Sequence, residues 1–71
     1  MNKQEWIEKI SKMQSNGNNF LSLNWSDVDW EAWNSGDLTA DQQALVYACE
    51  KLGLMAMPGD MAPDTISFVN R

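Results

Sequence analysis

Signals that start a helix occur twice within residues 24–53, and they constrain the fold more than any other feature of the sequence. The first pair is Ser26 and Asp29. The second pair is Thr39 and Gln42. In each pair the first side chain can accept a hydrogen bond from an N–H of the first helical turn, and the second side chain can bond back to the N–H of the cap residue. The segment therefore predicts two helices that begin directly after Ser26 and Thr39.

Two glycines mark the other ends of these helices. Gly36 and Gly53 follow the two helical segments, and glycine adopts the left-handed conformation at a helix end without a steric penalty. The sequence predicts helices over residues 27–34 and 40–52. In the second of these, the expected buried stripe consists of Leu45, Ala48, Cys49 and Leu52.

A third helix is predicted over residues 3–14, where the apolar residues recur with helical spacing. These residues are Trp6, Ile7, Ile10 and Met13. A chain of 71 residues holds one core, so we expect residues 1–71 to form one mainly α domain of three helices. The expected core residues are Ile7, Ile10, Leu45, Cys49 and Leu52.

Two segments outside the helices are less regular. Within residues 20–25, Leu21, Leu23 and Trp25 alternate with polar residues, and within residues 65–69 Ile66 and Phe68 alternate with polar residues. A minor two-stranded β pairing of 20–25 with 65–69 is one interpretation, and the other is that Phe20, Leu21 and Leu23 fill the core from an extended linker. Residues 54–64 contain three methionines, two prolines and a glycine, which predicts a loop. We expect its methionines to fill gaps in the core rather than form a binding surface.

The charge is −5 and is unevenly distributed. Between residues 13 and 70 there are eight acids and one base, Lys51. Proteins that bind nucleic acid or membrane surfaces directly use lysine and arginine, so the sequence disfavours both ligands and favours a basic protein partner. The charged first residues do not resemble a signal peptide, and we expect a cytoplasmic location.

Several chemical functions lack the residues they need. The chain has one cysteine, Cys49, and no histidine, so a disulfide, a zinc site and the common base for a nucleophile are all missing. Asp27, Asp29 and Glu31 resemble the start of a calcium loop, but positions six and twelve hold alanine and leucine instead of glycine and glutamate. We expect no enzymatic activity, no cofactor and no metal.

Acids and tryptophans form the remaining pattern. Trp25 and Trp30 have the spacing of a hydrophobic staple around the Ser26 cap. We expect Trp25 and one of Trp30 or Trp33 to be core, and the other to be partly exposed. Five acids have no local explanation in a cap or a helix dipole: Glu31, Asp37, Glu50, Asp60 and Asp64. They serve either a binding surface or solubility alone. The candidate partner-binding residues are Trp30, Glu31, Trp33, Asp37, Tyr47 and Glu50.

Two classes of function fit this pattern. One is a protein-binding inhibitor or adaptor that presents acids and a tryptophan to a basic partner, for example a protein surface that normally holds nucleic acid. In its short length, acidity and lack of catalytic residues, the chain resembles the small inhibitor proteins encoded by phages and other mobile elements. The other class is a structural module that self-associates through its tryptophans, as a homodimer or larger oligomer.

Overall fold

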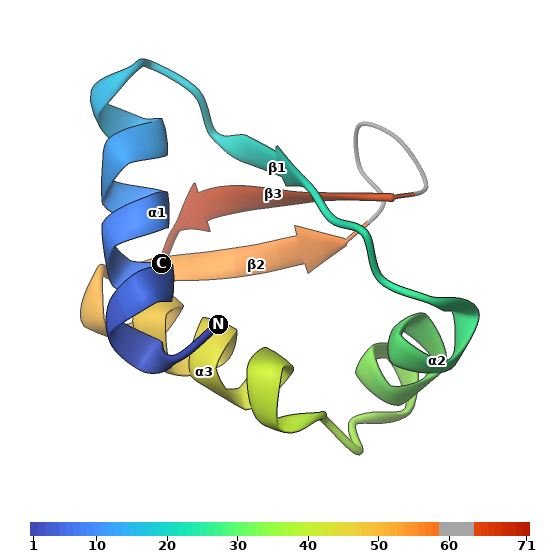
Figure 1. Ribbon diagram of the computed structural model, residues 1–71. Coiled ribbons are helices and arrows are strands. Elements are labelled where there is room, and N and C mark those ends of the chain that lie inside the picture. Colours follow the sequence, from blue (N-terminus) through green and yellow to red (C-terminus); the bar gives the residue numbers. More distant parts are fainter. Residues whose placement is uncertain (59–63) are drawn as a thin grey trace.

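The computed structural model describes residues 1–58 and 64–71 and contains three helices and a small antiparallel sheet in these residues (Figure 1). The elements in chain order are α1 (Lys3–Ser15), β1 (Phe20–Ser22), α2 (Asp27–Ser35), α3 (Ala40–Lys51), β2 (Leu54–Pro58) and β3 (Thr65–Asn70). The helices contain more than twice as many residues as the strands, so the mainly α prediction with a minor sheet is confirmed. Each predicted helix lies within a residue of its observed bounds.

Both predicted helix starts form as expected. Ser26 Oγ accepts from the Asp29 N–H at 3.2 Å, and the Asp29 carboxylate accepts from the Ser26 N–H at 3.1 Å. Thr39 and Gln42 make the same pair of bonds, at 3.2 and 3.0 Å. Asn2 caps α1 in the same way together with Glu5, a capping pair that our sequence analysis did not include. All three helices are therefore started by local side-chain hydrogen bonds.

The predicted helix ends are also confirmed. Gly36 is the residue at the end of α2 and has a φ of +83°, and Gly53 follows α3 with a φ of +69°. Both angles lie in the left-handed region that glycine adopts most easily. α2 and α3 therefore end within one residue of the positions that the sequence predicts.

The sheet has the order β1-β3-β2 with both pairs antiparallel. β1 pairs with the first half of β3, in the register Phe20↔Ser67 and Ser22↔Thr65. The predicted pairing is thus confirmed for residues 20–22 with 65–67, while residues 23–25 continue as an extended linker. β3 is the central strand.

The loop prediction for residues 54–64 is wrong over residues 54–58, which form β2 on the free side of β3. The strand was missed because both of its faces are apolar, so no alternation of polar and apolar residues marks it. Residues 59–63, including Asp60 and Met61, lie outside the described residues. Met55 and Met57 are 46% and 36% exposed, so the expectation that they fill the core is also wrong.

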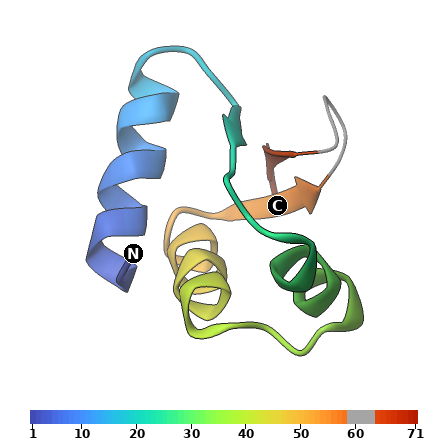
Figure 2. The same cartoon turned by 45° about the vertical axis from the view of Figure 1, so that its right-hand side comes forward.

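The core lies between α1, α3 and one face of the sheet. Its buried apolar residues are Trp6, Ile10, Met13, Leu23, Ala44, Leu45, Ala48, Cys49, Leu54, Ile66 and Phe68. Burial is thus confirmed for Ile10, Leu45 and Cys49, whereas Ile7 and Leu52 pack against the core only partly buried. α1 and α3 lie side by side, and α2 stands apart from them at the other end of the molecule (Figure 2).

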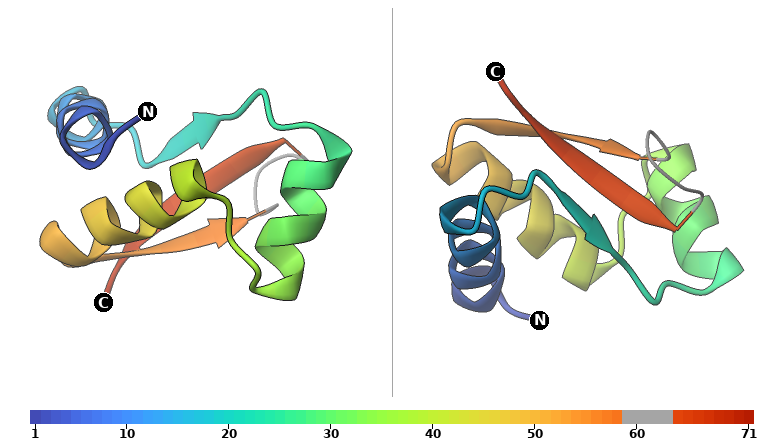
Figure 3. Two further views of the ribbon diagram at one scale, coloured as in Figure 1. Left: turned by 60° about the horizontal axis from the view of Figure 1, so that its bottom comes forward. Right: turned by 90° about the horizontal axis from the view of Figure 1, so that it is seen from above.

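The second face of the sheet carries exposed apolar side chains. The register places Phe20, Met57, Met55 and Val69 on this face, around the nearly buried Ser67. α3 lies across the opposite face, and the strands lie in front of it when the molecule is seen from above (Figure 3). We call these four residues the outer sheet patch. Antiparallel sheets with one solvated face usually carry polar residues there.

None of the helices in the described residues is both long enough and apolar enough to cross a membrane.

Candidate functional site

Three tryptophans form one cluster at α2. The rings of Trp25 and Trp30 lie 4.8 Å apart in an edge-to-face arrangement, and the rings of Trp25 and Trp33 lie 5.3 Å apart. Trp25 precedes the Ser26 cap and Trp30 lies in the first turns of α2, so the predicted hydrophobic staple is confirmed. Trp33 follows Trp30 by three residues and therefore reaches the same side of the helix.

None of the residues of α2 is buried. Trp25, Trp30 and Trp33 are each partly buried and pack against the edge of the core. Our expectation that Trp25 and one other would be core is therefore wrong; the buried tryptophan is Trp6, on α1. α2 has nine residues and packs only at the edge of the core, so it cannot bury several indoles at once. The cluster therefore leaves part of its aromatic surface open to solvent.

Exposed acidic residues lie on α2 and in the segments next to it. Asp27 and Glu31 are exposed on α2, and Asp37 is exposed in the turn that follows. Asp64 is also exposed. It lies near α2, because its backbone carbonyl accepts from the Leu23 N–H at 2.8 Å, where the chain leaves β1 toward α2. We call α2 with these acids and the tryptophan cluster the α2 surface.

The five basic residues all lie outside α2. Lys3, Lys9 and Lys12 are on α1, Lys51 ends α3, and Arg71 follows β3. Figure 1 shows α1 and the end of α3 at the left and α2 at the right. Glu5, Glu8 and Glu50 are exposed at the same end as the lysines, so this end carries both signs of charge, whereas α2 carries acids and no base.

The predicted site residues do not all come together. Trp30, Glu31, Trp33 and Asp37 belong to the α2 surface. Tyr47 instead lies on α3 between two ammonium groups, with Lys3 Nζ at 4.4 Å and Lys51 Nζ at 5.5 Å from its ring centre. Glu50 is exposed one turn further along α3. The structure thus places Tyr47 and Glu50 with the basic residues, away from the other four.

Asp41 joins the start of α3 to α1. Its Oδ1 accepts from the Met1 amino group at 2.6 Å and from Trp6 Nε1 at 3.2 Å. The contact with Met1 is the one ion pair within the described part of the chain. This hydrogen bond to Asp41 raises the pKa of the Met1 amino group. Local spacing does not predict this link between α3 and α1, so the role of Asp41 is a finding of the structure.

Gln42 joins α3 to α2. Its side chain is fully buried, and its Nε2 donates to the Asp29 carbonyl at 2.7 Å while its Oε1 caps Thr39. One amide therefore links the cap of α3 to the first turn of α2. The capping pattern predicted the bond to Thr39 and gave no indication of the bond to Asp29.

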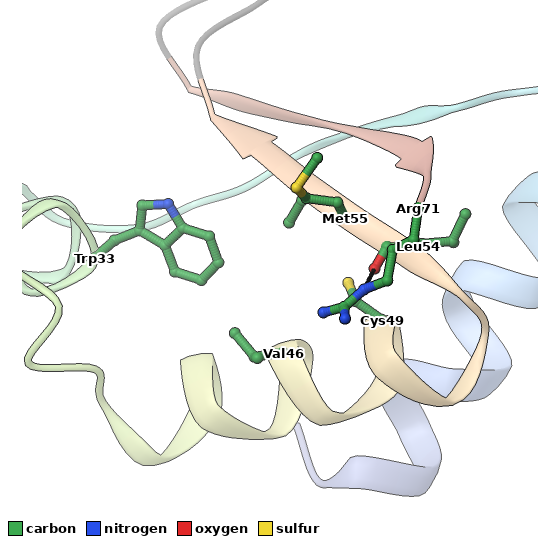
Figure 4. Close-up of a pocket in the computed structure, with 7 residues that line it drawn as sticks. Trp33, Val46, Cys49, Leu54, Met55 and Arg71 are labelled. Carbon is green, nitrogen blue, oxygen red and sulfur yellow. Dashed lines mark hydrogen bonds between the residues drawn. The ribbon is translucent and has the colours of Figure 1, made fainter.

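A pocket of about 170 Å³ lies between β2, α3 and α2 (Figure 4). Its lining residues are Trp33, Val46, Cys49, Leu54, Met55, Ala56 and Arg71. Val46 and Cys49 point into it from α3, with Trp33 at one end and Arg71 at the other. Apart from Trp33, none of these residues was a predicted site residue. No sequence pattern indicated the pocket, because its lining residues come from segments that are distant in the chain.

Cys49 on the pocket floor is 3% exposed, which confirms the prediction that it is a small buried apolar side chain. Burial raises its pKa to about 11, and Arg71 opposes this increase. A thiol with this pKa is protonated at neutral pH and is a poor nucleophile. Within residues 1–58 and 64–71, no three acidic, cysteine or histidine side chains are placed to hold a metal ion.

Comparison with protein-family models, with curated proteins and with solved structures gave no match to this chain.

Proposed function

We propose that this protein is a small protein-binding module, an inhibitor or adaptor, whose α2 surface docks on a basic surface of a partner protein. The observation that carries the proposal is that α2 holds two of three clustered tryptophans and yet has no buried residue. Tryptophan is enriched among the residues that contribute most binding energy at protein interfaces. An indole cluster that the fold leaves partly exposed is suited to that role.

The acids of the α2 surface favour a basic partner. Asp27, Glu31, Asp37 and Asp64 are exposed, and the basic residues lie outside α2. Such charges accelerate approach to a positive surface and disfavour acidic competitors, while the indoles contribute buried area. Proteins that bind nucleic acid have positive surfaces of this kind. We therefore propose that the protein inhibits its partner by competing with nucleic acid for such a surface.

The experiment compares three forms of the chain as bait in the source cell, with mass spectrometry of the proteins they retain. The test variant carries Glu31→Lys and Asp37→Lys. The control carries Gln4→Lys, Glu8→Lys and Gln14→Lys, three exposed positions on α1 that give the same total change in charge. We expect the native chain and the control to retain the same basic protein and the test variant to lose it.

The purified partner then allows rates to be measured. Charges at the rim of an interface act mainly on association, and salt screens them over about 8 Å at physiological ionic strength. The test variant should therefore associate more slowly at low salt and depend less on salt. Trp30→Ala should instead increase the dissociation rate, because truncating a strong interface residue lowers the binding free energy by about 2 kcal/mol or more. An association rate at low salt that is equal in the native chain and the test variant would mean that the acids serve solubility alone.

Self-association is a second candidate function, favoured by the outer sheet patch. Phe20, Met55, Met57 and Val69 are each more than a third exposed and lie on one face. Sedimentation across a hundredfold range of concentration tests it. A mass that rises with concentration, and that Met57→Lys with Val69→Lys returns to the monomer value, supports a structural module; a constant monomer mass rejects it.

A further inference from the structure

We propose that the groove between β2 and α3 is a second binding site, which takes an extended segment of a partner protein. In this complex the segment adds to the free edge of β2, inserts one apolar side chain into the pocket and places a carboxylate on Arg71. The inference goes beyond the α2 surface, because it concerns a different face and the opposite charge. Trp33 is common to both sites, so the tests below leave it unchanged.

The size of the pocket decides what kind of group enters it. Pockets that hold cofactors or other complete small ligands have volumes of about 300–1,000 Å³. A cavity of about 150 Å³ holds a single benzene ring. At about 170 Å³, this pocket fits one ring or one branched side chain. Six of its seven lining residues are apolar or a buried, protonated thiol, so the group that enters is an apolar side chain.

Arg71 supplies the charge that selects the rest of the ligand. Its Nε donates to the Leu54 carbonyl at 3.1 Å, which holds the guanidinium at one end of the pocket (Figure 4). Its other nitrogens make no hydrogen bond or ion pair with the residues that the structure describes. A planar guanidinium binds a carboxylate through two parallel bonds. An acidic residue beside the inserted side chain is therefore the complementary partner.

The free edge of β2 is the third part of the proposed binding site. The backbone N–H of Arg71 donates to the Gly53 carbonyl at 3.1 Å. Backbone groups of alternate residues in an antiparallel strand point to the same side, so Gly53, Met55 and Met57 form their backbone hydrogen bonds with β3. The backbone groups of the residues between and after them, Leu54, Ala56 and Pro58, point away from β3 toward the free edge. Pro58, which has no N–H, fits this outward position. The Leu54 carbonyl is bonded to Arg71, and in the described part of the chain the outward groups of Ala56 have no partner. An added strand would bond there, as in other complexes in which a peptide extends a sheet.

Strand geometry sets the sequence of the ligand. Side chains two residues apart project on the same side of a strand, so the apolar residue and the acid should be separated by one residue. The probes are the capped peptides Ser-Glu-Thr-Phe-Thr-Ser and Ser-Phe-Thr-Glu-Thr-Ser, which present this pair in both directions. The two control peptides for each carry lysine in place of glutamate, or alanine in place of phenylalanine.

Binding is measured by NMR titration of the isotope-labelled full chain. We expect one of the two probes to shift the Val46 methyl, Ala56 amide and Arg71 side-chain signals, with the lysine control weaker by about twofold to fivefold, the effect of an exposed ion pair. The alanine control should be weaker by about tenfold or more, as for the loss of a main anchor. No shift at these positions with either probe at several millimolar overturns the proposal.

Protein variants separate this site from the rest of the molecule. Val46→Phe fills the pocket and should abolish the shifts, whereas Val28→Phe, at a position 73% exposed on α2, should leave them unchanged. Arg71→Gln should remove the difference between the glutamate and lysine peptides. Equal binding of the probe to the native chain and to Val46→Phe would contradict the site. Signals at the β2 edge that broaden with protein concentration alone would show that a second copy covers it, and would also contradict the proposal.

Discussion

Among single residues, Gln42 is a buried polar side chain that connects two helices. It is fully buried, caps α3 through its oxygen and donates from its nitrogen to the Asp29 carbonyl on α2. Buried polar groups stabilise a fold only when their hydrogen-bonding partners are present. Replacing this amide tests whether the two bonds hold α2 in place.

We predict that Gln42→Ala lowers the free energy of unfolding by about 2–4 kcal/mol, since it removes a cap bond, leaves the Asp29 carbonyl without this donor and opens a cavity. Gln42→Glu should be as damaging at pH 7, because a buried carboxylate would face that carbonyl. It should recover in part at acidic pH, where a protonated Glu can donate. Urea unfolding measures the free energy of unfolding of both variants. The control is Gln43→Ala at an exposed position, and equal effects of Gln42→Ala and Gln43→Ala would contradict the prediction.

The ion pair between Asp41 and the Met1 amino group should make the stability of the fold depend on pH. The pKa of the Met1 amino group is raised above 8.0 by its hydrogen bond to Asp41. A group whose pKa is higher in the folded state stabilises the fold fully below its unfolded pKa, and this contribution disappears as the pH rises through the folded pKa. The stability contributed by this pair should therefore decline as the pH is raised above 8.

The variant Asp41→Asn isolates that decline. Asparagine keeps an oxygen that can accept from Trp6 Nε1 and removes the negative charge. We expect the native chain to lose stability more steeply than the variant between pH 7.5 and pH 9.5, as measured by thermal melting at fixed ionic strength. Parallel curves over this range would show that the ion pair does not contribute to stability.

At the scale of elements, α3 is the helix around which the core is assembled. It carries four buried apolar residues and packs against both α1 and β2. Leu45, Ala48 and Cys49 were predicted from sequence to be buried, whereas Ala44 was not, and Leu45 is 0% exposed. α2 differs in having no buried residue, and it is held at its edge by the tryptophan cluster and by Gln42.

We predict that Leu45→Ala lowers the free energy of unfolding by about 2–5 kcal/mol, because it removes buried methyl groups and leaves a cavity. A domain of this size has a total stability of about 3–5 kcal/mol, so the variant should be largely unfolded at 37 °C. Val28→Ala, at a position 73% exposed, should change the melting temperature little. A Leu45→Ala variant that melts with the native chain would show that α3 does not organise the core.

At the scale of the whole molecule, the layered fold distributes stability unevenly. β3 is bonded on both sides and carries Ile66 and Phe68 into the core, whereas α2 lies beside the core. Regions with few buried contacts open locally at a lower free energy than central strands. The region of the α2 surface is therefore the part of the fold that can adapt to a partner at least cost.

Native-state hydrogen exchange should show this order. We predict that the amides of Ile66 and Phe68 exchange with free energies close to that of global unfolding, and that the α2 amides exchange at clearly lower values. Urea added below the unfolding transition should accelerate β3 exchange more steeply, since global opening exposes more surface. Equal protection in α2 and β3 would mean that the molecule opens as a single unit.

Features that depend on neighbouring residues could be predicted without the structure. The capping pairs at Ser26 and Thr39, the left-handed glycines and the tryptophan staple all form as predicted. Each of these contacts joins residues within about five positions of each other, so the required geometry is set by the local chain. The buried stripe of α3 follows from helical periodicity in the same way.

Which surfaces meet depends instead on how distant segments pack in three dimensions. β2 forms because β3 offers a free edge to a segment that has no strand pattern of its own. The three tryptophans stay partly exposed because of where α2 docks, and Tyr47 lies between lysines because α1 packs beside α3. The pocket joins residues from position 33 to position 71. Contacts of this kind depend on the packing of distant segments, and local spacing carries no information about that packing.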